Sequence, residues 1–305
     1  MKYFDAHCDT AAEMYEQKVG LYDNGLHFDL SKMGAFENIC QCMAVFTPEK
    51  YDCNGGYERF KAITANLKRY IGNDAVLYDG TVSIGDLRTN DRLFVPTVEN
   101  GAVLDGDLDK IAALKEHGVR IMSLMWNDDN RFGCGCMTAD DRGLTAFGFL
   151  ALDEMRKCGM ILDISHMSVQ SFKDAMRHYD GAVMATHSNA MSVCEFPRNL
   201  YDWQLRELKD RGAFVGVNLC PLFLKIENDP NISHILRHIE YLIKALGESN
   251  VGFGCDFDGV DSLPEGIYGV EDMGKIYHMT EFMGSSLRDD VFFNNGMEYL
   301  MKNLL

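Results

Sequence analysis

The 305-residue sequence has few prolines, few basic residues and no repeated or low-complexity segment. Six prolines occur in the whole chain, and no stretch has the composition of a flexible linker, so we expect one domain spanning residues 1–305. Lysine and arginine number 29 against 46 acidic residues, which gives a formal charge of -17. This charge repels phosphate backbones and anionic lipid, and it argues against nucleic-acid and membrane-surface partners.

Long apolar segments are also missing. No stretch approaches the roughly 20 apolar residues that a membrane-spanning helix needs. The N-terminus reaches Asp5 without the basic and apolar regions of a signal peptide. We therefore expect a cytoplasmic protein, and the sequence leaves its oligomeric state open, a homodimer included.

Ten cysteines are present, but they are scattered along the chain. Without an export signal, scattered cysteines are typical of reduced core residues rather than of disulfides. Cys40 and Cys42, like Cys134 and Cys136, are separated by one residue, which is shorter than the gap usual in zinc sites. We interpret both pairs as packing residues.

Eight short runs rich in strand-forming residues recur, and most are separated by segments with apolar residues at three- and four-residue spacing. The runs are 2–8, 41–47, 92–99, 119–126, 159–166, 182–188, 213–220 and 251–258. Alternating strands and helices predict a parallel sheet, and eight strands in about 300 residues favour closure into a (β/α)8 TIM barrel of the metal-dependent hydrolase type. A doubly wound open sheet is the alternative, but no G-x-G-x-x-G or Walker sequence stands after an early strand.

The predicted ends of these strands carry an unusual set of side chains. They are His7 and Asp9 at the end of the first predicted strand, Glu99 at the end of the third, His166 at the end of the fifth, His187 at the end of the sixth, and Asp256 and Asp258 at the end of the eighth. Catalytic groups of a barrel cluster at the C-terminal ends of its strands. Three imidazoles and two carboxylates on one rim match the ligands of a two-metal hydrolytic site, with zinc as the best-fitting ion.

Each of these residues also has a purely structural interpretation. A histidine at the end of a strand can be a hydrogen-bonded packing residue, Glu99 can cap a helix, and the aspartates of DFDG can form a turn. The coincidence of all of them on one rim favours the metal site. The remaining histidines fall in loops or helices, and we interpret them as surface or packing residues: His27, His117, His178, His234, His238 and His278.

In this order the motifs resemble those of the membrane dipeptidase family, which are di-zinc (β/α)8-barrel hydrolases. The resemblance runs almost end to end through FDAHCD, HFDLSKMGAF, QCMAVF, TVENG, GLTAFG, LDISHMS, ATHSNA, PRNL, GFGCDFDGV and LPEGI. Several ordered motifs over a whole chain are far more specific than one His-x-Asp pair.

The resemblance implies roles for the matching positions. His7 and Asp9 would hold one Zn²⁺, His166 and His187 the other, and Glu99 together with a water or hydroxide would bridge the two. The bridging hydroxide would be the nucleophile, and Asp256 would transfer protons. The implied substrate is a dipeptide, with L,D-dipeptides included.

Substrate-binding residues follow from the same resemblance. Arg198 would hold the free carboxylate of the dipeptide, with Asn199 in support, and we assign Asp258 a structural role. Trp126 departs from the pattern, because the animal members carry a histidine there that is thought to stabilise the oxyanion. Trp126 donates its single N–H to the oxyanion, or another group or the zinc ions alone stabilise it and Trp126 forms a wall of the substrate pocket.

Two other functions compete with a zinc dipeptidase. A metal-dependent amidohydrolase or deaminase acting on a small amide would typically open with His-x-His, whereas this chain has His7-x-Asp9. A non-catalytic peptide-binding barrel would not require the five presumptive ligands and Asp256 together. The sequence therefore favours hydrolysis of dipeptides.

Overall fold

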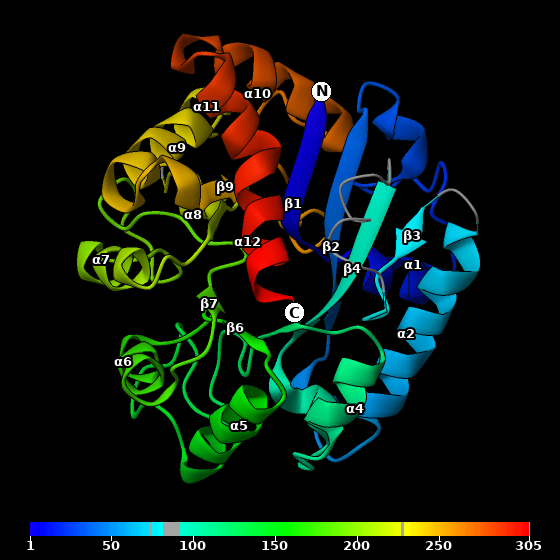
Figure 1. The fold of residues 1–305 in the computed structure, drawn as a ribbon, viewed down its shortest axis with the longest axis vertical. Coiled ribbons are helices and arrows are strands. Elements are labelled where there is room, and N and C mark those ends of the chain that lie inside the picture. Colours follow the sequence, from blue (N-terminus) through cyan, green and yellow to red (C-terminus); the bar gives the residue numbers. More distant parts are fainter. Residues whose placement is uncertain (73–74, 82–91, 227–228, 305) are drawn as a thin grey trace.

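The computed structural model describes residues 1–72, 75–81, 92–226 and 229–304, and nine parallel strands lie within this part of the chain (Figure 1). The strands are β1 (Lys2–Cys8), β2 (Asn38–Phe46), β3 (Val76–Leu77), β4 (Arg92–Glu99), β5 (Ile121–Met122), β6 (Ile161–Asp163), β7 (Val183–Met184), β8 (Val215–Val217) and β9 (Val251–Phe253).

Eight of the strands form the ring that the sequence predicts. Their order is β7-β6-β5-β4-β2-β1-β9-β8, and a parallel bridge between Ala185 and Val215 joins the end of β7 to β8. The (β/α)8 barrel is therefore confirmed. The short β3 is an addition that the sequence did not predict, and it pairs with the first half of β4, whereas β5 pairs near the end of β4.

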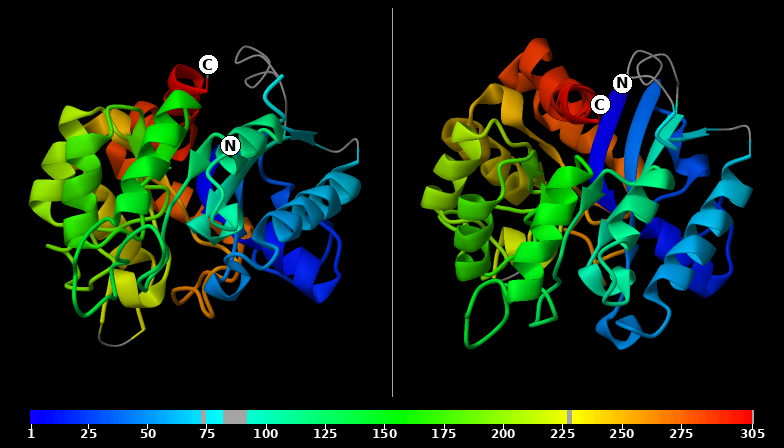
Figure 2. Two further views of the ribbon diagram at one scale, coloured as in Figure 1. Left: turned by 90° about the horizontal axis from the view of Figure 1, so that it is seen from below. Right: turned by 60° about the horizontal axis from the view of Figure 1, so that its bottom comes forward.

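Helices surround the ring (Figure 2). They are α1 (Thr10–Gln17), α2 (Gly56–Ile71), α4 (Lys110–Glu116), α5 (Ala146–Lys157), α6 (Val169–His178), α7 (Asp202–Asp210), α8 (Pro221–Leu224), α9 (Ile232–Leu246), α10 (Met273–Met279), α11 (Ser285–Asp289) and α12 (Asn295–Asn303), with a π-turn at Asp290–Asn294. None of these described helices is both long and apolar enough to cross a membrane.

The interior of the barrel is filled by side chains and closed at its N-terminal end by α12, which runs beside β1 in Figure 1. Phe4 and Ala6 of β1 pack there with Met297 and Leu300 of α12. Gly296 is required at this contact, because a Cβ at its position would lie 2.1 Å from the ring of Phe4. Since this end is plugged, a site must lie at the opposite rim.

The pairing register of β1 with β2 shifts between Asp5 and Cys8. Phe4 and Ala6 face the barrel interior, whereas Cys8 belongs to the layer between strands and helices, where its Sγ lies 3.5 Å from Met43 Sδ. A register shift of this kind re-aims the side chains that follow it. Cys8 therefore packs away from the rim.

The strands after β4 are shorter than the sequence predicts, with two or three residues each instead of seven or eight. Side chains take over some backbone hydrogen bonds at their ends: the N–H groups of Ser165 and Thr186 both donate to Asp163 Oδ1, at 3.0 Å each. The residues that follow these strands are thus free to leave the sheet geometry.

Candidate active site

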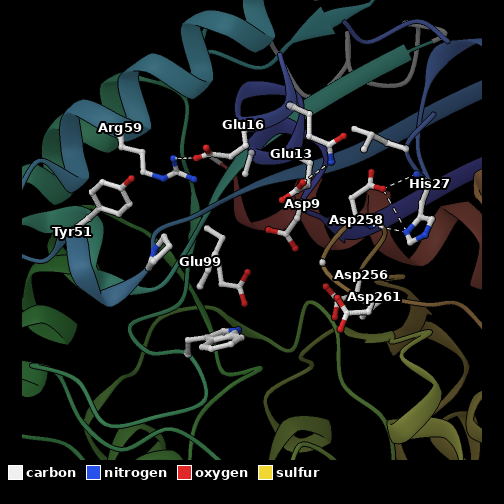
Figure 3. A pocket seen from close by; sticks show the side chains of 18 of the residues that line it. Asp9, Glu13, Glu16, His27, Tyr51, Arg59, Glu99, Asp256, Asp258 and Asp261 are labelled. Carbon is white, nitrogen blue, oxygen red and sulfur yellow. Dashed lines mark hydrogen bonds and ion pairs between the residues drawn. The ribbon is translucent and has the colours of Figure 1, made fainter. Parts of the chain in front are cut away.

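The rim at the C-terminal ends of the strands gathers the predicted ligands. His7 is the last residue but one of β1, Glu99 ends β4, and His166 and His187 follow β6 and β7 by three residues each. All four side chains are buried, as are Asp9 and Asp256. Figure 3 shows Asp9, Glu99 and Asp256 around one cavity.

Glu99 lies between two groups of side chains. Its Oε1 is 2.8 Å from His166 Nε2 and 4.0 Å from His187 Nε2, and its Oε2 is 3.5 Å from His7 Nε2. Burial alone would raise the pKa of the Glu99 carboxyl, but the hydrogen bonds and charges of His166 and His7 outweigh it and lower that pKa. An ionised carboxylate with one oxygen toward each group is suited to bridging two cations.

The first group, which we call the carboxylate half, consists of His7, Asp9 and Asp256. His7 Nε2 lies 3.4 Å from Asp9 Oδ2 and 3.8 Å from Asp256 Oδ1. Burial lowers the pKa of His7, but Asp9 and Glu99 raise it well above its usual value. Burial and the charge of Glu99 in turn raise the pKa of Asp9 to about 7.

Two buried atoms of this half, His7 Nε2 and Asp9 Oδ1, have no hydrogen-bond partner. A buried polar atom without a partner is costly unless a ligand satisfies it. Nitrogen and carboxylate oxygen are donors that zinc accepts, and ligand atoms of His7, Asp9 and Asp256 lie within 4.8 Å of one another. The residues present therefore fit a metal ion.

The second group, the imidazole half, consists of His166 and His187, whose Nε2 atoms are 2.9 Å apart. The other nitrogen of each ring has a hydrogen-bonding partner. His166 Nδ1 lies 3.0 Å from Asn127 Oδ1, and His187 Nδ1 lies 2.7 Å from Thr186 Oγ1. Burial lowers the pKa of both histidines, His187 most strongly. Neutral imidazoles are the form that binds a metal.

Asp256 stands at the edge of the carboxylate half on a residue with φ of 63°, and it is 8% exposed. Asn218 Nδ2 donates to its Oδ2 at 2.8 Å, while Oδ1 faces His7. The turn folds closely over the site, because a Cβ at Gly259 would lie 2.3 Å from both Asp256 Oδ1 and Asp9 Oδ2. Asp256 is thus held by one oxygen and presents the other to the cavity.

Asp258 has a different environment, in agreement with the structural role assigned from the sequence. Its Oδ2 accepts from Thr10 Oγ1 at 2.6 Å, and its Oδ1 accepts from the His27 N–H at 2.6 Å. His27 Nδ1 accepts from the Asp258 N–H at 3.0 Å. His27 is therefore a packing residue, but it also lines the cavity, which the sequence did not indicate.

The cavity has a volume of about 680 Å³, and more acidic than basic side chains line it (Figure 3). Asp258 and Asp261 lie on one side. Arg59 lies on the other, paired with Glu16 and stacked near Tyr51. A space of this size suits a small molecule.

Trp126 forms part of the wall of this cavity. Its ring packs 5.2 Å from that of Phe46 and 6.2 Å from that of His166, and the residue is 38% exposed. Trp126 thus lines the cavity, and its part in substrate binding stays a prediction.

Arg198 and Asn199 line a second cavity of about 530 Å³. Arg198 Nη1 donates to Ser188 Oγ and Nη2 to the His187 carbonyl, both at 2.9 Å, whereas its buried Nε has no partner. Asn199 donates to the carbonyls of Cys194 and Phe223. Its amide therefore supports the loop rather than the Arg198 side chain directly.

Sequence reasoning missed several residues that surround the ligands. Asn218 contacts Asp256, Asn127 contacts His166, and Thr186 contacts His187. Each stands at or near a strand end, which is the same signal that identified the candidate ligands. Asn and Thr are too common at such positions to be recognised by type.

This chain is similar to proteins of a known peptidase family. The model of the family described as "Membrane dipeptidase (Peptidase family M19)" matches residues 1–286. An uncharacterised protein encoded in the pqqA 5′ region of Klebsiella pneumoniae is 36% identical over 200 residues, which cover 62% of this chain and 73% of that protein. An uncharacterised dipeptidase of Schizosaccharomyces pombe is 31% identical over 83% of this chain and 66% of its own length.

Solved structures share the fold. A metallopeptidase from Rhodobacter sphaeroides, bound to a phosphinate mimic of the dipeptide L-Ala-D-Ala, aligns with a TM-score of 0.88 at 23% identity over 99% of both chains. A probable dipeptidase from Pseudomonas aeruginosa aligns with a TM-score of 0.87 at 16% identity over 100% of this chain and 95% of the other. At these identities the likeness establishes the barrel alone.

Proposed function

This chain belongs to the membrane dipeptidase family and is a zinc-dependent dipeptidase, and from that premise we propose that it uses two zinc ions to hydrolyse free dipeptides, L,D-dipeptides included. The family resemblance drawn from the sequence is thereby confirmed. The single observation that supports two ions is the placement of Glu99, whose two oxygens face different groups of ligands.

In this proposal His7 and Asp9 hold one ion, His166 and His187 hold the other, and Glu99 contacts both. Two bound zinc ions would polarise the scissile carbonyl and lower the pKa of a shared water molecule, so that hydroxide is available near neutral pH. The unpartnered His7 Nε2 and Asp9 Oδ1, and the facing nitrogens of His166 and His187, support this assignment.

Asp256 is the proposed acid and base. It would take a proton from the attacking water and deliver it to the departing amine, so that one peptide bond and one water molecule yield two amino acids. Its support is geometric: Asn218 fixes Oδ2, while Oδ1 faces the cavity beside His7 and Asp9.

Arg198 is proposed to bind the free carboxylate of the substrate. Its guanidinium lies beside the imidazole half through its hydrogen bond to the His187 carbonyl, and its Nε–H is buried without a partner. Charge-assisted hydrogen bonds from a planar guanidinium suit a carboxylate. Trp126 would form the wall next to the scissile bond.

The test compares four substrates with zinc-loaded protein: L-Ala-L-Ala, L-Ala-D-Ala, N-acetyl-L-Ala-L-Ala and the tripeptide L-Ala-L-Ala-L-Ala. We expect turnover of both free dipeptides and little turnover of the blocked and longer compounds. Equal turnover of the N-acetylated compound would contradict recognition of a free dipeptide. Turnover of the L,L isomer alone would remove L,D-dipeptides from the proposal.

A further inference from the structure

The outward nitrogen of His187 is held by a hydroxyl group rather than by a carboxylate or a carbonyl. Its Nδ1 lies 2.7 Å from Thr186 Oγ1, and both residues are 1% exposed. In a neutral imidazole one nitrogen carries the proton and the other is the metal ligand, so the partner of Nδ1 decides which atom can bind. A hydroxyl can either donate or accept, and its own partners decide which it does here.

The Thr186 hydroxyl donates to Asp163, the last residue of β6. Its Oδ1 accepts from the Ser165 hydroxyl at 2.6 Å and from the N–H groups of Ser165 and Thr186 at 3.0 Å each. Its Oδ2 accepts from Thr186 Oγ1 at 2.5 Å. Four donors around one carboxyl group are the pattern of an ionised carboxylate, which can only accept.

The direction of the chain of hydrogen bonds follows. Thr186 Oγ1 has one proton, and it gives that proton to Asp163. The same oxygen can then only accept, and it faces His187 Nδ1 at 2.7 Å and, less closely, His7 Nδ1 at 3.5 Å. His187 Nδ1 therefore carries a hydrogen atom, and its Nε2 keeps the lone pair. That lone pair faces His166 Nε2 at 2.9 Å and Glu99 Oε1 at 4.0 Å.

Asp163 also fixes the backbone of this half. The two N–H groups that it binds belong to the residues immediately before His166 and His187. Ser165 Oγ in turn accepts from the His187 N–H at 3.1 Å. One carboxylate thus controls both the position of the two strand ends and the tautomer of one ring.

Asp5 is the corresponding residue of the carboxylate half, and it differs in one respect. Its Oδ1 accepts from the N–H groups of His7 at 3.0 Å and Cys255 at 2.9 Å, so it too fixes two strand ends. Its Oδ2 accepts from the Tyr3 hydroxyl at 2.7 Å. Asp5 therefore orients backbone, whereas Asp163 reaches a ligand ring through Thr186.

We propose that Asp163 and Thr186 are positioning residues that fix His187 as an Nε2 ligand and thereby set the affinity of the imidazole half for its metal ion. This inference rests on the proposed two-zinc function. Removal of such outer partners typically costs about 10- to 100-fold in metal affinity.

The experiment compares Thr186→Val with Thr186→Ser. Valine has nearly the shape of threonine but no hydroxyl, whereas serine keeps the hydroxyl. Zinc dissociation constants are measured by competition with a chromogenic chelator, and thermal unfolding of the metal-free proteins checks their folding. We expect Thr186→Val to bind one of two zinc ions about 10- to 100-fold more weakly, with Thr186→Ser close to wild type. The other ion should be weakened less, because Thr186 Oγ1 lies 3.5 Å from His7 Nδ1 but 2.7 Å from His187 Nδ1.

Ser165→Ala is the matched control. Ser165 also donates to Asp163, and its hydroxyl contacts the backbone N–H of His187 and, at 3.2 Å, Thr186 Oγ1, but not the His187 ring. We expect this variant to weaken zinc binding less than Thr186→Val does. An equal loss would place the effect in the backbone and overturn the role assigned to the Thr186 hydroxyl.

Two further results separate the possible failures. Wild-type affinity in Thr186→Val, or equal weakening of both ions, would overturn the inference. A wild-type protein that binds fewer than two zinc ions would instead overturn the proposed function. If Thr186→Val does not fold, ¹⁵N NMR of the histidine rings in zinc-loaded wild type decides: a protonated Nδ1 on His187 is expected, and metal on Nδ1 contradicts it.

Discussion

The two halves of the candidate metal centre are built from different chemistry. The carboxylate half surrounds His7 with acidic groups, and it leaves His7 Nε2 and Asp9 Oδ1 without partners. In the imidazole half, the Nδ1 atoms of His166 and His187 contact neighbouring side chains, and their Nε2 atoms face each other. One half therefore attracts a cation mainly by negative charge, and the other mainly by oriented lone pairs.

Glu99 lies between these halves. Because the halves differ in chemistry, we expect them to contribute to different steps of the proposed reaction. The carboxylate half includes Asp256, our proposed acid and base, while the imidazole half borders Arg198, our proposed binder of the substrate carboxylate. Substitutions in the first should change the rate of the chemical step, and substitutions around the second should change binding of substrate or metal.

The largest effect is expected at Asp256. Asp256→Asn removes the proton-transferring group but keeps the shape and the Asn218 contact, so kcat for a free dipeptide should fall by about 10²- to 10⁴-fold. Zinc content, measured by atomic absorption, should remain at the wild-type value. Loss of zinc together with activity would make Asp256 a ligand instead.

Asp258→Asn is the matched control for this variant. Asp258 lies two residues further along the same turn and binds Thr10 and His27. We expect lower thermal stability but a kcat within about tenfold of wild type, because its hydrogen bonds hold the turn and not the substrate.

A smaller effect is expected at Arg198. Arg198→Lys replaces a planar fork by a point charge, and loss of a charge-assisted hydrogen bond of about 1.5–3 kcal/mol should raise KM for a free dipeptide roughly 10- to 100-fold. The KM for the corresponding dipeptide amide should change little. A parallel rise for both substrates would contradict carboxylate binding by Arg198.

The smallest effect is expected at Cys8, which lies between His7 and Asp9 but faces the helices. Cys8→Ser places a hydroxyl in an apolar layer beside Met43 and should lower the free energy of unfolding by about 1–3 kcal/mol, measured in urea. Zinc content should not change. The exposed Cys53 provides the control, because Cys53→Ser should leave stability nearly unaltered.

The sequence predicted which side chains share one rim, because this depends on topology. Once the parallel barrel is inferred, His7, Glu99 and His166 must share a rim, since all barrel strands end on the same side. The register shift after Asp5 also contributes. Ala6 packs inside the barrel, whereas Cys8 packs in the layer between strands and helices.

The sequence did not reveal which backbone groups would bind to side chains. The strands at β6 and β7 are short because Asp163 accepts N–H groups that would otherwise extend the sheet, and no spacing rule marks this. The contacts of Arg198 with Ser188 and the place of His27 in the cavity wall depend on loop conformation, which residue types alone do not determine.

The most direct test of the central claim is the zinc stoichiometry of wild type and Glu99→Gln, measured after reconstitution and gel filtration. If Glu99 joins two halves that each hold an ion, wild type binds two zinc ions per chain, and the variant loses at least one because a neutral amide replaces the shared carboxylate. One ion per chain in wild type, or two tightly bound ions in Glu99→Gln, would contradict the account.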